Sequence, residues 1–196
     1  MIKFKDTESS KPYEIFKDYY EKASKADQLA IEAICISSSI KNEVDSRFVN
    51  LKYIIGDEWI FFSNYNSPKA LQFLDNINIA CVFYWSKTNA QIRMKAKIKK
   101  TNKFFSDDYF SKRSDTKNAL AISSNQSRPI DSYEDVISSY ENTLATENLT
   151  LRPEYWGGYS FTPHYFEFWE GHPSRLNKRL AFSFDNGVWN KSLIQP

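Results

Sequence analysis

Short runs of β-branched and aromatic residues, bounded by turn signals, recur along this chain and constrain its fold more than any other feature. They lie at residues 31–37, 48–55, 58–63, 77–85 and 91–101, and again at 159–161, 165–169, 180–184 and 188–194. Gly56-Asp57 and Asp185-Asn186-Gly187 separate neighbouring runs and are typical of hairpin turns. Many short antiparallel strands in 196 residues predict one mainly β domain, a β-barrel with helical additions.

The helical additions are predicted from periodicity and from capping signals. Apolar residues recur at helical spacing over residues 12–25, and Ser67 followed by Pro68 is a typical start for a short helix over residues 67–76. We expect a helix over residues 106–124 that starts at Ser106 and Asp107. Another is expected over residues 132–145, where Ser132 and Asp135 resemble a capping box.

The composition argues against several classes of function. Lys and Arg number 26 against 24 Asp and Glu, so the net charge of +2 does not indicate a nucleic-acid partner. The two His and two Cys lie far apart, which gives no metal-site spacing, and no run approaches the roughly 18 apolar residues of a membrane span. Cys35 and Cys81 lie within apolar runs, so we expect buried thiols in a reducing, cytoplasmic compartment.

Glycine is scarce, and this restricts how a phosphate group could be bound. The five glycines are Gly56, Gly157, Gly158, Gly171 and Gly187, and their spacing matches neither G-x-G-x-x-G nor a P-loop. Any phosphate must therefore contact side chains or ordinary helix N-termini.

Two segments in the first half of the chain place cationic side chains where an anion could bind. Arg47 and Lys52 would lie on opposite faces of one strand unless a bulge or a strand end intervenes. Ser63, Ser67 and Lys69 gather at a strand-to-helix junction, which fits either an anion site or a simply capped helix.

A third segment lies near the C-terminus. If residues 175–179 form an extended strand, Arg175, Asn177 and Arg179 share one face of it. Either an anion then lies between the two arginines, or the residues belong to a salt-bridged row on the surface. Gly157 and Gly158 follow a tryptophan, which indicates either a tight bend or a close approach of the backbone to something flat. No G-x-S-x-G motif offers a catalytic nucleophile.

In this order, the segments RFVNLK, FFSNYNSPKA, the Gln91 strand, NQSRPI, YWGGY and FEFWEGHPSRLNKRL resemble the pyridoxine/pyridoxamine 5′-phosphate oxidase family. The resemblance runs from about Lys11 to Pro196 and implies an FMN-binding split β-barrel, with one domain over residues 1–196. It also implies a homodimer with FMN at the subunit interface. Residues 1–28 would form an N-terminal helical segment, and the strands of 156–196 would complete the flavin site.

The resemblance implies a function for particular residues of this chain. The flavin contacts would be Arg47, Lys52, Phe62, Ser63, Lys69, Gln91, Gln126, Ser127, Trp156 and Arg179. The substrate, a small phosphorylated pyridine, would contact Lys52, Tyr109, Arg113, Lys117 and Arg175. Arg175 and Asn177 would be catalytic. The implied reaction passes a hydride from substrate to flavin N5, and O₂ reoxidises the flavin to give pyridoxal 5′-phosphate and H₂O₂.

The chain departs from the family pattern at several positions. Phe62 stands where the family usually has a tyrosine, Pro68 replaces a flavin-phosphate arginine, and Lys117 replaces a substrate-phosphate serine. Asn177 replaces the histidine of an Arg-Leu-His signature and cannot titrate. We also expect the chain to lack the basic N-terminal extension that in the family folds over the substrate. We therefore expect a mostly preserved flavin site and an altered substrate site.

Three alternatives remain open. One is a related flavin oxidase that acts on another reduced ring, as in the phenazine-pathway relatives. Another is a flavin- or vitamer-binding protein with little turnover, and the last is a β-barrel without a cofactor. Most of the 32 aromatic rings are interpreted as barrel core and dimer contact, and only Trp156, Tyr109 and Phe62 are expected at the site.

Overall fold

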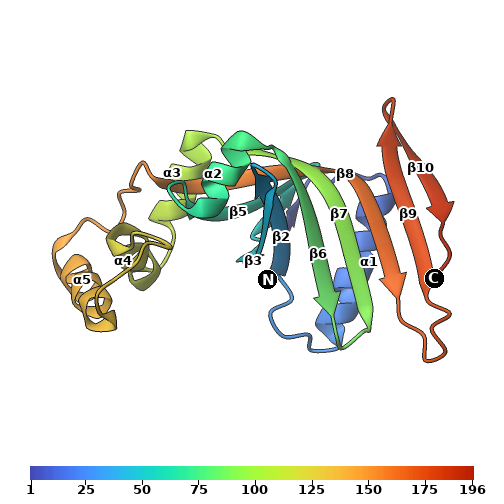
Figure 1. The fold of residues 1–196 in the computed structure, drawn as a ribbon, viewed down its shortest axis with the longest axis horizontal. Coiled ribbons are helices and arrows are strands. Elements are labelled where there is room, and N and C mark those ends of the chain that lie inside the picture. The colour runs from blue at the N-terminus through green and yellow to red at the C-terminus, as the bar shows by residue number, and fades with distance from the viewer.

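The strands of the computed structural model, which describes all residues 1–196, form one sheet of ten strands. The sheet has the order β1-β4-β5-β8-β7-β6-β2-β3, while β9 pairs with β8 and β10 pairs with β9 (Figure 1). The strands are β1 (Lys3–Lys5), β2 (Ala33–Ile40), β3 (Glu43–Asn50), β4 (Tyr53–Ile55), β5 (Glu58–Asn64), β6 (Asn78–Trp85), β7 (Ala90–Lys100), β8 (Trp156–Glu170), β9 (Lys178–Asp185) and β10 (Val188–Leu193). The prediction of a mainly β domain with helical additions is confirmed.

The long strand β8 changes its partner along one edge. One edge of β8 pairs first with β5, through Trp156–Phe161, and then with β9, through Tyr165–Glu170. Its other edge pairs with β7, and the register shifts there because His164 is an extra residue between the partners of Lys95 and Ala96. Such a bulge bends and twists a strand. The bend lies where β8 leaves one partner and joins the other.

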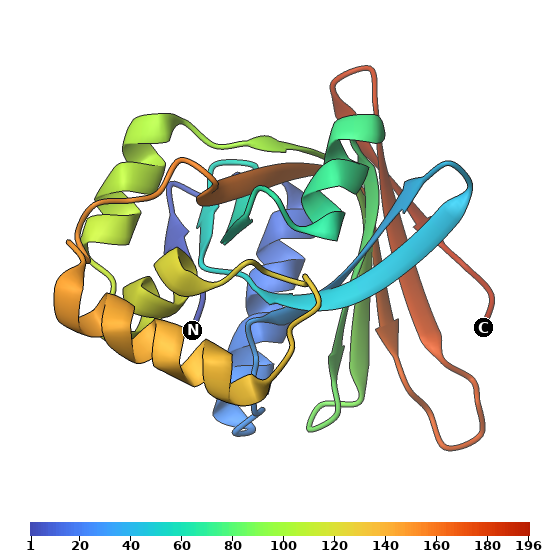
Figure 2. The same cartoon turned by 60° about the vertical axis from the view of Figure 1, so that its left-hand side comes forward.

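Helix α1 (Lys11–Lys25) lies against the curled sheet (Figure 2), and its buried aromatic side chains belong to the hydrophobic core. Tyr13, Phe16 and Tyr20 are buried, and the ring of Phe16 lies edge-on to Trp59 with 4.4 Å between centroids. Fully buried rings of this size contribute about 1.5–3 kcal/mol each through apolar burial. The prediction that most aromatics form the core is therefore confirmed for these rings.

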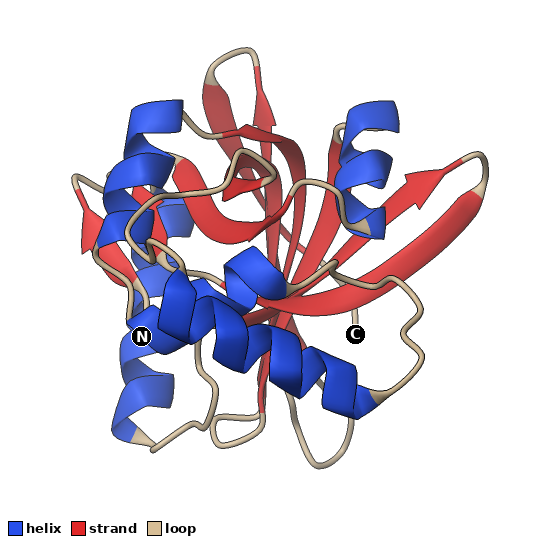
Figure 3. Ribbon diagram, turned by 90° about the vertical axis from the view of Figure 1, so that its left-hand side faces the viewer, coloured by secondary structure: helices blue, strands red, loops and turns tan.

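The other helices lie toward one end of the sheet. They are α2 (Pro68–Asp75), α3 (Lys103–Ser111), α4 (Asp115–Ser123) and α5 (Tyr133–Thr146). Helix α5 packs along α4 and faces the viewer in Figure 3. Ser132 accepts a hydrogen bond from the backbone N–H of Asp135, as its capping signal predicts.

Several predicted boundaries are wrong. The run at 48–55 is divided between β3 and β4, and the single helix expected over residues 106–124 is divided between α3 and α4. Asn102, not Ser106, caps α3, because its side chain accepts a hydrogen bond from the N–H of Phe104. β1 was not predicted; it pairs in parallel with β4.

Both hairpin predictions are confirmed, since Gly56, Asn186 and Gly187 have positive φ in the two turns. No helix of the chain is both long enough and apolar enough to cross a membrane.

Candidate active site

A cavity of about 760 Å³ opens between β5, α3, the start of α4 and the connection from β3 to β4. β3 ends at Asn50, so Lys52 lies beyond the strand and does not follow its alternation. The strand end that the prediction required is therefore present, and Lys52 lines the cavity. The cavity brings together nine predicted site residues: Lys52, Phe62, Ser63, Lys69, Tyr109, Arg113, Lys117, Gln126 and Trp156.

One wall of the cavity is a stack of three parallel rings. Phe62 lies 3.6 Å from Tyr109 and 5.4 Å from Trp156 between ring centroids, with interplanar angles of 6° and 10°. The guanidinium of Arg113 lies 4.4 Å from the ring centroid of Trp156, within the range of a cation–π contact. The three rings expected at the site therefore lie together in it.

Close packing explains the paired glycines of β8. A Cβ atom on Gly157 would lie 2.2 Å from the hydroxyl of Tyr65, and one on Gly158 would lie 2.4 Å from Oγ1 of Thr101. Both glycines are within the strand, and neither has positive φ. The glycines therefore do not form a tight bend, and the backbone is closely approached by the side chains of Tyr65 and Thr101.

Three cationic side chains, Lys52, Arg113 and Lys117, also line the cavity, and the carboxylate of Asp108 on the same lining is paired with Lys112. Burial lowers the pKa of Lys52, and the charges of Lys117 and Arg113 lower it further, although Glu32 opposes this effect. Nη1 of Arg113 is buried and has no hydrogen-bond partner, while Nη2 donates to the carbonyl of Lys117 at 3.3 Å. Repelling cations and an unpaired buried donor make this cluster suited to an anion such as a phosphate group.

A second positive position lies at the start of α2. Lys69 is 8% exposed, and Nζ donates to Oγ of Ser67 at 3.1 Å. Burial lowers the pKa of Lys69 to about 8, and the charge of Arg47 contributes. Ser63 lines the same cavity as Lys69, and Ser67 is the N-cap residue of α2. A phosphate could bind here without a glycine-rich loop.

Arg47 and Ser127 do not line the cavity. The guanidinium of Arg47 donates to Oγ of Ser38 at 2.6 Å and to Oε1 of Gln72 at 2.8 Å, so it lies behind Lys69. Ser127 has a φ of 65° and follows Gln126, which does line the cavity and accepts a hydrogen bond from Ser63.

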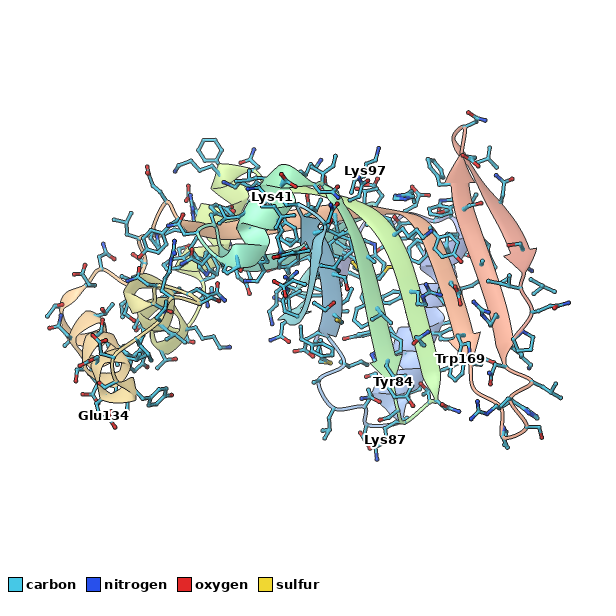
Figure 4. All side chains as sticks on the ribbon, in the orientation of Figure 1. Lys41, Tyr84, Lys87, Lys97, Glu134 and Trp169 are labelled. Atoms are coloured by element: carbon cyan, nitrogen blue, oxygen red, sulfur yellow. The ribbon has the colours of Figure 1, made fainter.

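The remaining predicted residues form a second group on another part of the sheet. Gln91 of β7 is opposite Trp169 of β8, which is opposite Arg179 of β9. These three residues form one row across β7, β8 and β9. Trp169 was not predicted as a site residue from the sequence, because its place in this row follows from strand register alone. In Figure 4, Trp169 lies far along the sheet from Glu134 of α5, and so this row is on the side away from α4 and α5.

Arg175 and Asn177 are not on an extended strand, which corrects the prediction of one shared face. They lie in the connection between β8 and β9, where Arg175 has a φ of 60°. Oδ1 of Asn177 accepts a hydrogen bond from the N–H of His172 at 3.0 Å and closes this loop. The side chain of Arg179 pairs with Glu167, so part of the predicted salt-bridged row is present.

Comparison with known proteins identifies the family. Residues 156–196 match the family model described as the pyridoxine 5′-phosphate oxidase C-terminal dimerisation region. Pyridoxine/pyridoxamine 5′-phosphate oxidase from Actinobacillus pleuropneumoniae serotype 5b is 31% identical over 186 residues, which cover 94% of this chain and 89% of that protein. The oxidase of the same name from Cytophaga hutchinsonii is 35% identical over 192 residues, with 94% and 88% covered.

Solved structures agree in fold. PhzG from Burkholderia lata 383, in complex with tetrahydrophenazine-1-carboxylic acid, superposes with a TM-score of 0.89 and 24% identity over 95% of this chain and 93% of PhzG. A pyridoxamine 5′-phosphate oxidase-related, FMN-binding protein from Nostoc punctiforme gives a TM-score of 0.76 at 14% identity, with 96% and 99% covered. With relatives above 30% identity along nearly its whole length, the chain belongs to the pyridoxine/pyridoxamine 5′-phosphate oxidase family.

Proposed function

We propose that this protein is an FMN-dependent oxidase that converts pyridoxamine or pyridoxine 5′-phosphate to pyridoxal 5′-phosphate. The observation that carries the proposal is the pair of anion positions on one cavity, at Lys69 and at the Lys52–Arg113–Lys117 cluster. A flavin and a phosphorylated substrate carry one phosphate each, so two separate positions match the two molecules. When bound, FMN would accept the hydride of the substrate and pass the electrons to O₂, which gives H₂O₂.

The residues of the first position suit the phosphate of FMN. Lys69, Ser63 and the first turn of α2 would hold it, with the charge of Arg47 behind them. Pro68 occupies the first position of α2, where it needs no N–H partner, and it supplies no charge. This site therefore depends on Lys69 more than a site with a neighbouring arginine would.

The residues of the second position suit the substrate phosphate. Arg113 offers the unpaired Nη1, and Lys52 and Lys117 add charge. The hydroxyl of Tyr109 can donate as well, because the ring is fixed by its stack against Phe62. Binding at this position would hold the reacting carbon in one orientation.

The second group of residues would complete the site in a homodimer. Gln91, Trp169 and Arg179 lie on one row of the sheet, with Arg175 and Asn177 in the adjoining loop. We place this row of one subunit against the cavity of the other. The match of residues 156–196 to a dimerisation region supports this arrangement. Asn177 would orient the substrate ring by a hydrogen bond but would not move a proton at neutral pH.

A flavin oxidase that acts on a larger reduced ring is the second candidate. A smaller cavity of about 230 Å³ adjoins the cation cluster, and Leu120 and Ala121 of α4 give it an apolar wall. A ring system larger than pyridine could extend into this space.

The test is oxidation in air. The purified protein is loaded with FMN and mixed with pyridoxamine 5′-phosphate, and formation of pyridoxal 5′-phosphate and H₂O₂ is followed. Equal yields of the two products would support the proposed reaction. Failure to bind FMN would refute both oxidase functions, whereas bound FMN without turnover would favour the larger-ring substrate or a binding protein.

A further inference from the structure

Glu167 of β8 is a buried carboxylate that the proposed reaction does not use. It is 2% exposed, although Tyr165 and Trp169, its neighbours on the same strand face, are only partly buried. A carboxylate is seldom buried so completely unless cations and hydrogen-bond donors replace its water. The groups that surround Glu167 therefore indicate what it does.

Two arginines from the adjacent strands compensate the charge of Glu167. Arg179 of β9 donates from Nε and Nη2 to Oε1, at 3.0 and 2.8 Å. Arg93 of β7 donates from Nη1 to Oε2 at 2.9 Å, and the hydroxyl of Tyr165 donates to the same oxygen at 3.1 Å. Both carboxylate oxygens are thus engaged, and each arginine holds a different one.

These contacts restrict the guanidinium of Arg179 to one orientation. Besides its two bonds to Glu167, it donates from Nη1 to the carbonyl of Gln195 at 2.9 Å. Three of its five N–H donors are therefore used, and two remain free. Because the guanidinium is planar and rigid, the three bonds determine the direction of the other two N–H groups.

We propose that Glu167 is a positioning residue that orients Arg179 toward the flavin in the dimer. The proposal rests on the proposed function, which places Arg179 at the flavin. Arg93 is half exposed and holds the other oxygen of Glu167, so it supports the carboxylate without belonging to the site. A glutamine at position 167 would keep the shape of the side chain but lose the charge that binds both arginines.

The first experiment compares the FMN affinity of Glu167→Gln, Arg179→Gln and the double variant by the quenching of flavin fluorescence. We expect each single substitution to raise Kd by about tenfold, and the double variant to bind no more weakly than either, because both act through one interaction. Glu170→Gln is the matched control on the same strand. Its carboxylate accepts from Tyr19 and contacts neither arginine, so its Kd should change by less than about twofold.

The second experiment needs no flavin. In ¹⁵N-labelled apoprotein, the Nε–H signal of Arg179 should exchange slowly with water, because this group donates to a buried carboxylate. The signal should disappear in Glu167→Gln and remain in Glu170→Gln. Dispersed backbone signals in each variant show that it is folded.

The outcomes distinguish the two proposals. Wild-type protein that does not bind FMN contradicts the proposed function and, with it, the flavin part of this inference. Wild-type protein that binds FMN, together with an unchanged Kd in Glu167→Gln or an additive double variant, contradicts the positioning of Arg179 alone. A persistent Nε–H signal in Glu167→Gln contradicts it as well, whatever the flavin does.

Discussion

Phe62 and Tyr109 stack face to face, with 3.6 Å between ring centroids and an angle of 6° between their planes. The contact joins β5 to α3 and fixes the phenol at the edge of the cation cluster. Phe62, which stands where the family usually has a tyrosine, thus contributes a ring surface and no hydroxyl. The ring and the hydroxyl of Tyr109 can therefore be tested separately.

We expect Tyr109→Phe to raise KM for pyridoxamine 5′-phosphate severalfold, because it removes one phosphate donor and keeps the stack. Its melting temperature should match that of the wild type. Tyr109→Ala removes the stack as well, and should lower the free energy of unfolding by about 1–3 kcal/mol. Steady-state kinetics and thermal unfolding measure the two effects, and an equal KM in wild type and Tyr109→Phe would exclude the hydroxyl from binding.

The cation cluster predicts a graded loss of substrate binding. Arg113→Gln should raise KM by about tenfold or more, since a charge-assisted hydrogen bond is worth about 1.5–3 kcal/mol. Lys117→Ser restores the residue usual in the family and should raise KM less, because Arg113 and Lys52 remain. The matched control is Lys103→Ser, because Lys103 pairs with Asp107 on α3 and neither residue lines the cavity. Competitive inhibition by inorganic phosphate should weaken in the same order, and an unchanged inhibition constant in Arg113→Gln would contradict the site.

Lys69 predicts a pH dependence of FMN binding. Its pKa is lowered from 10.5 to about 8 in the free protein, so the ammonium form dominates below pH 8 and is lost as the pH rises through 8. FMN affinity should therefore fall above pH 8, and Lys69→Gln should bind FMN weakly without this step. Titrations between pH 6 and 10, with constant ionic strength, would show it.

The same lowered pKa affects the stability of the apoprotein. Between about pH 8 and 10.5 the unfolded chain holds the Lys69 proton more strongly than the folded chain, so the contribution of Lys69 to the free energy of unfolding rises with pH. Lys69→Met should accordingly unfold at a higher temperature than wild-type apoprotein at pH 7. A lower melting temperature at that pH would mean that burial of the ammonium group is already compensated.

Asn177→His is expected to increase turnover of pyridoxamine 5′-phosphate, because an imidazole titrates near neutral pH and an amide does not. A ring nitrogen could also accept the hydrogen bond from His172 that closes the loop. The variant should show a pH–rate profile with a step near pH 6–7 that the wild type lacks. An unchanged rate would show that the missing histidine does not limit catalysis.

Gly157 predicts a steric effect with a specific rescue. A Cβ at this position would meet the hydroxyl of Tyr65 at 2.2 Å, so Gly157→Ala should destabilise the fold by about 1–3 kcal/mol. Combination with Tyr65→Phe removes the nearest atom and should recover part of the loss. Chemical denaturation of both variants measures the difference, and no recovery in the double variant would place the strain elsewhere.

Local signals in the sequence predicted the parts of this fold that local interactions decide. Pro68 at the first position of α2, Ser132 at the cap of α5 and the Asn186-Gly187 turn each act on the few residues around them. Side chains alternate between buried and exposed along β7, as the pleat of a strand requires. The same alternation failed for Arg175, because the hydrogen bond between His172 and Asn177 turns the chain before β9 begins.

The sequence by itself determined the class of elements, the absence of glycine-based phosphate loops and the order of segments that resembles an oxidase family. Only the tertiary structure decided which of those segments meet. Lys52 comes from one part of the chain and the neighbours Arg113 and Lys117 from another, and their shared cavity depends on where β3 ends and how α3 packs. Trp169 and Glu167 became visible through strand register and burial, because both depend on partners that no spacing along one strand reveals.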